Sequence, residues 1–330
     1  MEAVKKFWTS VVYGKDEEKK RPRAIFTKKF YIDHGGNFFC HVVLIGIIFL
    51  ILFPFIQKVC TMFLGYDDLS DTTVQYIPKH FSLRTLITTI GIMDYWMTLL
   101  RTLLLCVIAA VLQTLSCTLV AYGFARFKFV GRGILFACVI AVLLIPPQVI
   151  MTSLYMKFTY FNVLGIPKLL TGGTINITEG MWPFILLSAT AIGFKNSLYI
   201  YMLRQFFRGM PTEIEEAGMI DGSSHMGIFF RLMLPNAIPM MVTIILFAFS
   251  WQWSDNFYST LFLSHGNFSV ITNKLLTLNS YGMGYAEFTD VFRHAIIDTG
   301  VILAIIPLVI VYLFGQKFFV QGVSQSGIVG

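Results

Sequence analysis

Long apolar runs separated by short polar stretches form the main pattern along the chain. Six of these runs approach the roughly 20 residues that a helix needs to cross a lipid bilayer. They cover residues 37–57, 102–125, 133–156, 180–203, 236–263 and 296–314. Pro146 and Pro147 in the third run, and Pro307 in the sixth, predict helix kinks. The pattern therefore predicts an all-α integral membrane protein with about six transmembrane helices.

Composition supports a membrane location. Of the 330 residues, 56% are hydrophobic and 13% are charged, with a mean hydropathy of +0.70, whereas soluble domains carry about 25% charged residues. The net charge of +7 is explained without a nucleic-acid partner, because Lys and Arg are enriched at the cytoplasmic edges of membrane proteins. The five cysteines lack CxxC or His-paired spacing, which predicts packing roles rather than a metal site or disulfides.

The distribution of Lys and Arg predicts the orientation in the membrane. Nine of them lie in the first 35 residues, and a cytoplasmic arm there also places Arg126, Arg208 and Lys317 in the cytoplasm, with both termini. The predicted organisation has four parts. They are a basic arm at 1–35, a first transmembrane helix with a long external connection at 36–97, a transmembrane core at 98–319 containing a cytoplasmic loop at 208–235, and a glycine-rich tail at 320–330.

The cytoplasmic loop predicts a helix, a turn and a second helix. Thr212 and Glu215 have capping-box spacing, and three glutamates fall in the first turns, where acidic side chains suit the helix dipole. Asp221 and Gly222 predict the end of this first helix. A second helix is expected to start at Ser223 or Ser224 and to end where Pro235 interrupts it. Because residues 226–234 are strongly apolar, this half of the loop is expected to pack against another surface.

The same loop carries a resemblance. Glu216-Ala217-Gly218, then Gly222, then Leu234-Pro235 resemble the EAA loop of permease subunits of bacterial ATP-binding-cassette (ABC) importers, Glu-Ala-Ala-x₃-Gly-x₉-Ile-x-Leu-Pro. Gly218 replaces the second Ala, which is expected to loosen the short helix by up to about 1 kcal/mol, and Leu232 replaces Ile. The stretch 119–133 and the tail resemble the carbohydrate-uptake branch, and most closely the second permease subunit of maltose-type sugar importers.

The resemblance implies a type I ABC importer permease fold in a bacterial inner membrane. It implies that the loop holds a coupling helix that docks on a cytoplasmic ATPase, with ATPase-coupling residues Glu215, Glu216, Ala217, Gly218, Asp221, Gly222, Leu234 and Pro235. The implied partners are a second homologous permease, a dimer of ATP-binding subunits, an extracytoplasmic solute-binding protein and membrane lipid. The sequence holds no GxxxxGK[ST] motif. We therefore expect a transport subunit rather than an enzyme, with no cofactor of its own, and ATP and magnesium used by the partner ATPase.

Polar residues inside the apolar runs are candidates for the substrate pathway, because such groups are costly in a membrane. A wall of aromatic rings, amides and a carboxylate suits a sugar, which offers both ring faces and hydroxyl groups. The candidate residues are Lys195, Asn196, Trp251, Gln252, Trp253, Asp255, Asn256 and Tyr258. Two simpler interpretations stay open. Trp253 and Tyr258 could mark the membrane interface, and Lys195 could pair with Asp255.

Alternative functions require features that the sequence does not offer. A stand-alone secondary transporter or channel would need ion-coupling residues and often an internal repeat, and it would leave the EAA-type loop unexplained. A membrane enzyme would need clustered His, Asp or Glu, whereas the six histidines are scattered. His294 and Asp298, at i, i+4 spacing, predict a hydrogen bond near a helix start rather than a metal site. The identity and size of the solute stay open.

Overall fold

The structure is a computed structural model. It describes residues 28–74, 76–162, 173–193, 195–263, 266, 268–280 and 290–327. Most of the predicted basic arm therefore lies outside the described residues. The chain divides into two compact units, residues 1–57 and 58–330. The first unit carries most of α2 (Lys28–Met62), whose apolar stretch Phe39–Met62 is long enough to span a membrane and is largely exposed, as expected of a helix facing lipid.

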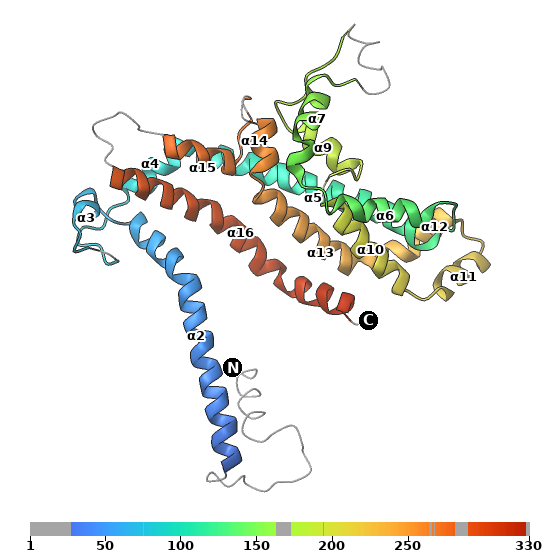
Figure 1. Ribbon diagram of the computed structural model, residues 1–330, viewed down its shortest axis with the longest axis horizontal. Helices are drawn as coiled ribbons and strands as arrows, with labels where there is room; N and C mark the ends of the chain where they lie inside the picture. Colours follow the sequence, from blue (N-terminus) through green and yellow to red (C-terminus); the bar gives the residue numbers. More distant parts are fainter. Residues whose placement is uncertain are drawn as a thin grey trace. The chain divides into compact units, whose positions relative to one another are not determined.

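The second unit is helical, and its described residues form no β-strand beyond two isolated bridges. At one end of the unit lie the short helices α3, α4 and α15, and at the other end lie α11 and α12 (Figure 1). In chain order the elements are α3 (Tyr66–Ser70), α4 (Arg84–Met93), α5 (Tyr95–Arg126), α6 (Arg132–Val142), α7 (Pro147–Thr159), α9 (Trp182–Ala189), α10 (Asn196–Gly209), α11 (Glu213–Ile220), α12 (His225–Ile228), the π-helical turn η1 (Phe229–Met233), α13 (Leu234–Trp253), α14 (Phe257–Leu263), α15 (Ile271–Ser280) and α16 (Asp290–Gly327).

Four stretches of the described chain are long and apolar enough to cross a membrane. They are Phe39–Met62, Tyr95–Arg126, His225–Trp253 and Asp290–Lys317, and the pair α6 and α7, bent by 99°, gives a fifth if it counts as one span. Among the described residues there are thus four to five candidate spans, where the hydropathy pattern predicts about six transmembrane helices. The run at 180–203 is divided into α9 and α10, because Ala191 adopts a left-handed φ of 56° and ends the helix.

The helix α5 forms the centre of the second unit and packs against α9, α10 and α13. Its buried face contains small residues, which let neighbouring helices approach closely. Cys106, Ala110 and Cys117 are almost completely buried there, so the predicted packing role holds for these two cysteines. Cys40 and Cys138 are exposed and Cys60 is half-buried, and all five thiols are free.

The helix α16 continues through Pro307, and polar side chains from two other helices support it there. Pro307 has no N–H to offer the carbonyl of Leu303, four residues earlier. The hydroxyl of Tyr95 donates to that carbonyl at 3.0 Å, and the indole N–H of Trp253 donates to the next one, Ala304, at 3.0 Å. These bonds satisfy the backbone within an apolar core and link α5, α13 and α16.

A second correction concerns Asp298. Its carboxylate forms an ion pair with Lys58 rather than a hydrogen bond at a helix start. The prediction from the i, i+4 spacing was wrong because α16 already begins at Asp290, which places Asp298 two turns inside the helix.

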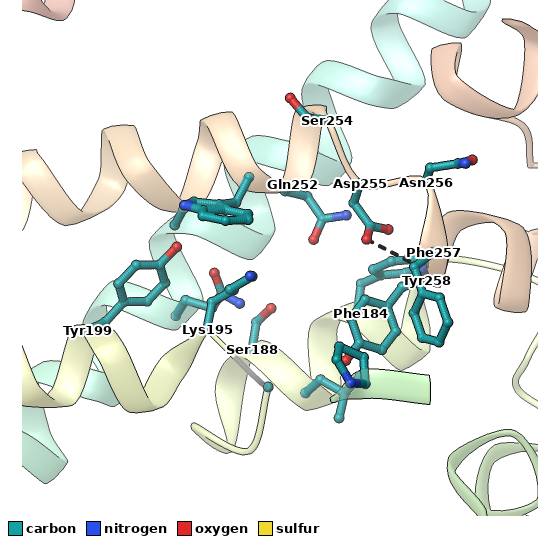
Figure 2. Close-up of a pocket in the computed structure, with 16 residues that line it drawn as sticks. Phe184, Ser188, Lys195, Tyr199, Gln252, Ser254, Asp255, Asn256, Phe257 and Tyr258 are labelled. Atoms are coloured by element: carbon teal, nitrogen blue, oxygen red, sulfur yellow. Dashed lines mark hydrogen bonds between the residues drawn. The ribbon is translucent and has the colours of Figure 1, made fainter. Parts of the chain in front are cut away.

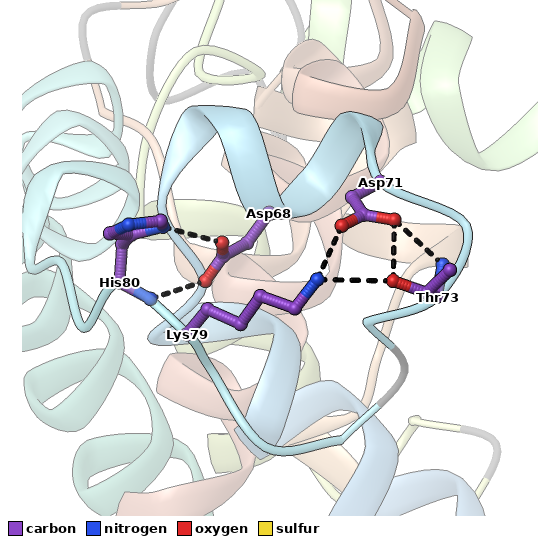
Figure 3. A network of polar contacts seen from close by, with 5 residues as sticks. All are labelled: Asp68, Asp71, Thr73, Lys79 and His80. Atoms are coloured by element: carbon purple, nitrogen blue, oxygen red, sulfur yellow. Dashed lines mark hydrogen bonds and ion pairs between the residues drawn. The ribbon is translucent and has the colours of Figure 1, made fainter.

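The connection between α3 and α4 is held by a polar network (Figure 3). The buried carboxylate of Asp68 accepts hydrogen bonds from the backbone N–H and the ring Nδ1 of His80, at 2.7 and 2.9 Å. Asp71 pairs with Lys79 at 2.7 Å and also accepts from Thr73. These donors hold the pKa values of both carboxyl groups below their ordinary value, so the loop is folded around two ionised aspartates.

Candidate functional site

The loop at 208–235 forms the helix, turn and helix that its sequence predicts. The first helix, α11, ends at Asp221, and Gly222 takes a left-handed φ of 74°. The N–H of Ser223 bonds to the carbonyl of Gly218 and the N–H of Gly222 to that of Met219, both at 3.0 Å. This pair of bonds is a Schellman motif, which depends on a residue that tolerates positive φ. Gly222 therefore fixes the shape of the turn.

Two details at the helix ends differ from the prediction. Thr212 has helical dihedral angles and its side chain makes no capping bond, because a capping side chain requires an extended backbone. The capping box is therefore absent, whereas Ser224 does cap the second helix by accepting from the N–H of Gly227 at 3.2 Å. Pro235 does not end the second helix either. The preceding π-helical turn, Phe229–Met233, changes the hydrogen-bond register, and α13 accommodates Pro235 in its first turn.

The structure divides the eight residues expected to act in docking into two groups. Glu216, Ala217, Asp221 and Gly222 are exposed on the outer side of the loop, and Pro235 is exposed at the start of α13. The remaining three, Glu215, Gly218 and Leu234, are directed toward the protein interior.

The inward group has structural roles. A Cβ atom on Gly218 would lie 3.0 Å from side-chain carbons of both Ile228 and Leu232, so the glycine lets α11 pack closely on the second helix. Leu234 packs against the core. Glu215 accepts a hydrogen bond from the Tyr122 hydroxyl at 3.0 Å.

A cavity of about 290 Å³ lies where several helices are interrupted. The breaks are at 143–146 between α6 and α7, at 190–195 between α9 and α10, and at 254–256 between α13 and α14. Lys195 and Asp255 reach the cavity from two of these breaks, Pro147 reaches it from the first position of α7, and Gln113 reaches it from α5, which is unbroken. The cavity lies beside two of the candidate spans, Tyr95–Arg126 and His225–Trp253, and polar groups inside such spans usually serve a function.

The charged residues of the cavity do not pair with each other. The ammonium group of Lys195 lies 3.5 Å from the ring centroid of Trp251, a cation–π contact. The carboxylate of Asp255 caps α14 by accepting from the backbone N–H and the hydroxyl of Ser259, at 2.8 and 3.1 Å. The two side chains face the same space (Figure 2), but no Lys195–Asp255 ion pair forms among the described residues.

Six of the eight predicted pathway residues line the cavity, namely Lys195, Trp251, Gln252, Asp255, Asn256 and Tyr258. The other two do not. Trp253 is buried against α16 through its bond to Ala304, and it stacks on Phe249. Asn196 is completely buried and donates to the carbonyl of Leu187 at 3.3 Å, so it stabilises the break between α9 and α10.

The cavity also contains residues that the sequence analysis missed. Tyr199, Ser188 and Phe184 line it. Tyr199 lies four residues after Lys195, a spacing that places both on one face of a helix and could have indicated it. Among the described residues, the hydroxyl of Tyr199 and the side-chain nitrogen of Gln252 are buried and have no hydrogen-bond partner. Within the described residues, no group of three or more His, Cys, Asp or Glu could hold a metal ion.

Comparisons with known proteins agree on one family. The family model described as "Binding-protein-dependent transport system inner membrane component" matches residues 117–325. The probable ABC transporter permease protein YurM of Bacillus subtilis is 25% identical over 319 residues, which are 95% of this chain and 93% of that protein. The arabinooligosaccharides transport system permease protein AraQ of Halalkalibacterium halodurans is 24% identical over 290 residues, 86% of this chain and 93% of that protein.

Among the solved structures that share the fold, one serves as an example. It is a crystal structure of a bacterial ABC transporter involved in the import of the acidic polysaccharide alginate. The TM-score is 0.71 at 17% sequence identity, with 90% of this chain and 99% of that chain covered. The likeness therefore shows a shared fold, although few residues are identical.

Proposed function

Because this chain belongs to the family of binding-protein-dependent transport system inner membrane components, we propose that it couples a solute pathway to ATP hydrolysis in a partner subunit through the loop at 208–235. Its family consists of transport components rather than enzymes. The chain is thus a multi-pass inner-membrane permease subunit of an ABC importer.

The observation that carries the proposal is the apolar surface formed by the end of α11 and the start of α12, on either side of the turn. Ile220 is 86% exposed, Met226 65% and Met219 48%, beside the exposed acidic residues Glu216 and Asp221. Apolar side chains gathered on a rigid protruding turn indicate a surface that another protein covers. We assign that protein as the ATPase, with Glu216 and Asp221 binding cationic or amide groups around an apolar centre.

The proposed complex has two permeases, two ATPases and one extracytoplasmic binding protein. Both termini and the loop lie in the cytoplasm, in accord with the positions of Lys and Arg. The opposite end of the second unit, with α3, α4 and α15, then faces the binding protein. ATP and magnesium bind the ATPase subunits, and their closure on ATP draws the two coupling loops together, which switches the permeases from inward- to outward-facing.

The proposed solute is a saccharide, and the 290 Å³ cavity is the part of its pathway that this subunit provides. The aromatic ring of Trp251 suits the apolar face of a sugar ring, while Tyr199 and Gln252 offer unused hydrogen-bonding groups. Two of the similar proteins are named for arabinooligosaccharides and for alginate, which supports the same solute class here. The volume suits a single ring rather than a whole polysaccharide.

Docking is tested by co-purification of the tagged permease with its ATPase in detergent. Ile220→Asp should weaken recovery by about tenfold or more, because burying an Ile contributes about 1.5–3 kcal/mol. Gly222→Val should act similarly by disrupting the turn, since Val does not tolerate positive φ. Ile77→Asp is the matched control, because Ile77 is 84% exposed and lies in the external connection. Equal recovery of all variants, or a permease recovered alone, would favour a stand-alone transporter.

The cavity is tested with neutral arabino-oligosaccharides and with acidic uronate oligosaccharides as probes. Quenching of tryptophan fluorescence in the reconstituted complex should reveal binding of one class, and Trp251→Phe should abolish the signal. Tyr199→Phe should weaken binding by about fivefold or more, because it removes a hydroxyl group available to the sugar. Quenching that persists in Trp251→Phe would place the site elsewhere.

A further inference from the structure

Glu215 differs from the other acidic residues of α11 because its side chain is directed into the protein. We propose that Glu215 is a positioning residue which, with Tyr122 and Arg126, transmits movement of the docked loop to α5. This inference rests on the docking proposed above. It assigns Glu215 to the internal side of the coupling mechanism rather than to contact with the ATPase.

Three elements meet at this cluster, which we call the Glu215 tie (Tyr122, Arg126 and Glu215). The Tyr122 hydroxyl donates to Glu215 Oε1 at 3.0 Å, and Arg126 Nε lies 3.5 Å from the same oxygen. Arg126 Nη2 also donates to the carbonyl of Met210 at 2.7 Å. The last turn of α5 is therefore connected to both the end of α10 and the start of α11. The side chains of Arg126 and Glu215 are only 8% and 13% exposed, so water screens the ion pair weakly.

The tyrosine of the tie is held firmly. Its ring packs against Phe207 of α10, at 5.5 Å between centroids, and against Phe229 of the π-helical turn, at 4.8 Å. Phe127 closes another side at 5.6 Å. Because these rings restrict Tyr122 to one orientation, a displacement of Glu215 acts on the backbone of α5 rather than rotating a loose side chain.

The helix α5 connects the tie to the cavity without interruption. Gln113, which lines the cavity, lies nine residues before Tyr122, or about 14 Å along the helix. The pairs α6 and α7, α9 and α10, and α13 and α14 are interrupted beside the cavity, whereas α5 is helical from Tyr95 to Arg126. A rigid helix carries a rigid-body movement over this distance, and an interrupted one absorbs part of it.

The variants must separate transmission from folding. Glu215→Ala leaves the buried charge of Arg126 without its partner, which could itself destabilise the loop. Tyr122→Phe is milder, because it removes only the hydroxyl and keeps the ring contacts. The exchange Glu215→Arg with Arg126→Glu restores an ion pair with reversed polarity. Glu213→Ala is the matched control, since Glu213 is an exposed glutamate in the first turn of the same helix.

The experiment measures hydrogen exchange in the complex of permease and ATPase in nanodiscs, with and without the ATP analogue AMP-PNP. In the natural chain and in Glu213→Ala, the analogue should change exchange in both α11 and residues 114–126 of α5. In Tyr122→Phe and Glu215→Ala, the α11 response should remain. The ratio of hydrogen-exchange protection in α5 with AMP-PNP to that without it should fall by about 2- to 30-fold. The double variant Glu215→Arg with Arg126→Glu should restore part of this ratio.

Two failures are distinguishable. If α11 responds in every variant and α5 responds equally in all of them, the Glu215 tie does not transmit movement and the inference is refuted while docking stands. If α11 of the natural chain does not respond to AMP-PNP, the docking proposal itself is refuted, and the inference with it. Exchange without nucleotide must stay unchanged in Tyr122→Phe, because a general loss of structure would also lower the α5 response and would contradict a positioning role.

Discussion

The hydrogen bond from Tyr95 to α16 gives a prediction that depends on a proline in another helix. Pro307 leaves the carbonyl of Leu303 without its usual helical donor, and the Tyr95 hydroxyl fills that position at 3.0 Å in a buried site. Tyr95→Phe should therefore destabilise the protein by leaving a buried acceptor unsatisfied. Pro307→Ala supplies a backbone N–H for Leu303, so Tyr95→Phe should matter less in that background.

The magnitude follows from two ranges. An unsatisfied buried acceptor costs about 1–3 kcal/mol, and hydrogen bonds between membrane helices contribute about 0.6–2 kcal/mol. We expect Tyr95→Phe to cost about 1–2 kcal/mol beside Pro307, and less than about 0.5 kcal/mol beside Ala at position 307. For the folded unit of 58–330 the larger cost corresponds to a decrease in Tm of roughly 2–4 °C.

The assay uses thiols that the fold already buries. Cys106 and Cys117 lie buried in α5, and a thiol-reactive dye reports their exposure on heating once the remaining cysteines, Cys40, Cys60 and Cys138, are replaced by Ser. Four proteins complete a double-mutant cycle, which cancels the separate effect of removing the proline. An equal loss of Tm from Tyr95→Phe in both backgrounds would show that the hydroxyl does not compensate for Pro307.

Two further predictions concern packing and pH. Gly300→Ala should lower Tm in the same assay, because its Cβ would lie 2.5 Å from Leu278 Cδ1 and overpacking costs about 1–3 kcal/mol. The control Gly123→Ala should leave Tm equal or higher, because none of the described atoms would lie within 4 Å of its Cβ. Identical Tm shifts in the two variants would contradict this packing. The His80 hydrogen bonds hold the pKa of Asp68 below 3.8, so their contribution is complete above that pH and is lost as the pH falls through the lowered value. Hydrogen-exchange protection of residues 64–82, corrected for intrinsic rates, should decrease only at such acid pH. In Asp68→Asn the protection should be low at every pH. If Asp68→Asn leaves the dependence of protection on pH unchanged, Asp68 does not have this role.

Local chemistry determined which features were predictable from sequence. Runs of apolar residues identified the helices. Gly222 identified the turn of the loop, because glycine tolerates positive φ whatever its distant neighbours are. The sequence left Ser223 and Ser224 as alternative caps of the second helix, because a serine hydroxyl can accept a bond from a nearby backbone N–H, and the structure assigns the role to Ser224. The sequence also indicated six of the 16 residues that line the cavity, since polar groups in apolar runs are rare.

Features that depend on distant residues were not predictable. The interruption between α9 and α10 is stabilised by Asn196 bonding to Leu187, which a hydropathy pattern does not reveal. The inward direction of Glu215 depends on Tyr122, 93 residues away in sequence. Trp253 matched a pathway residue by type, yet it is buried because α16 offers the carbonyl of Ala304. For each of these three side chains, the local sequence allows several positions, and a contact with a residue distant in sequence determines which one the side chain takes.

Site-specific photo-crosslinking at Ile220 tests the central claim most directly. A benzoylphenylalanine residue introduced there in the assembled complex should form an adduct with the ATP-binding subunit, because Ile220 is the most exposed apolar side chain of α11. The same residue at position 77 should not. An adduct from position 220 alone would establish that the loop docks on the ATPase, whereas no adduct, or equal adducts from both positions, would contradict the account.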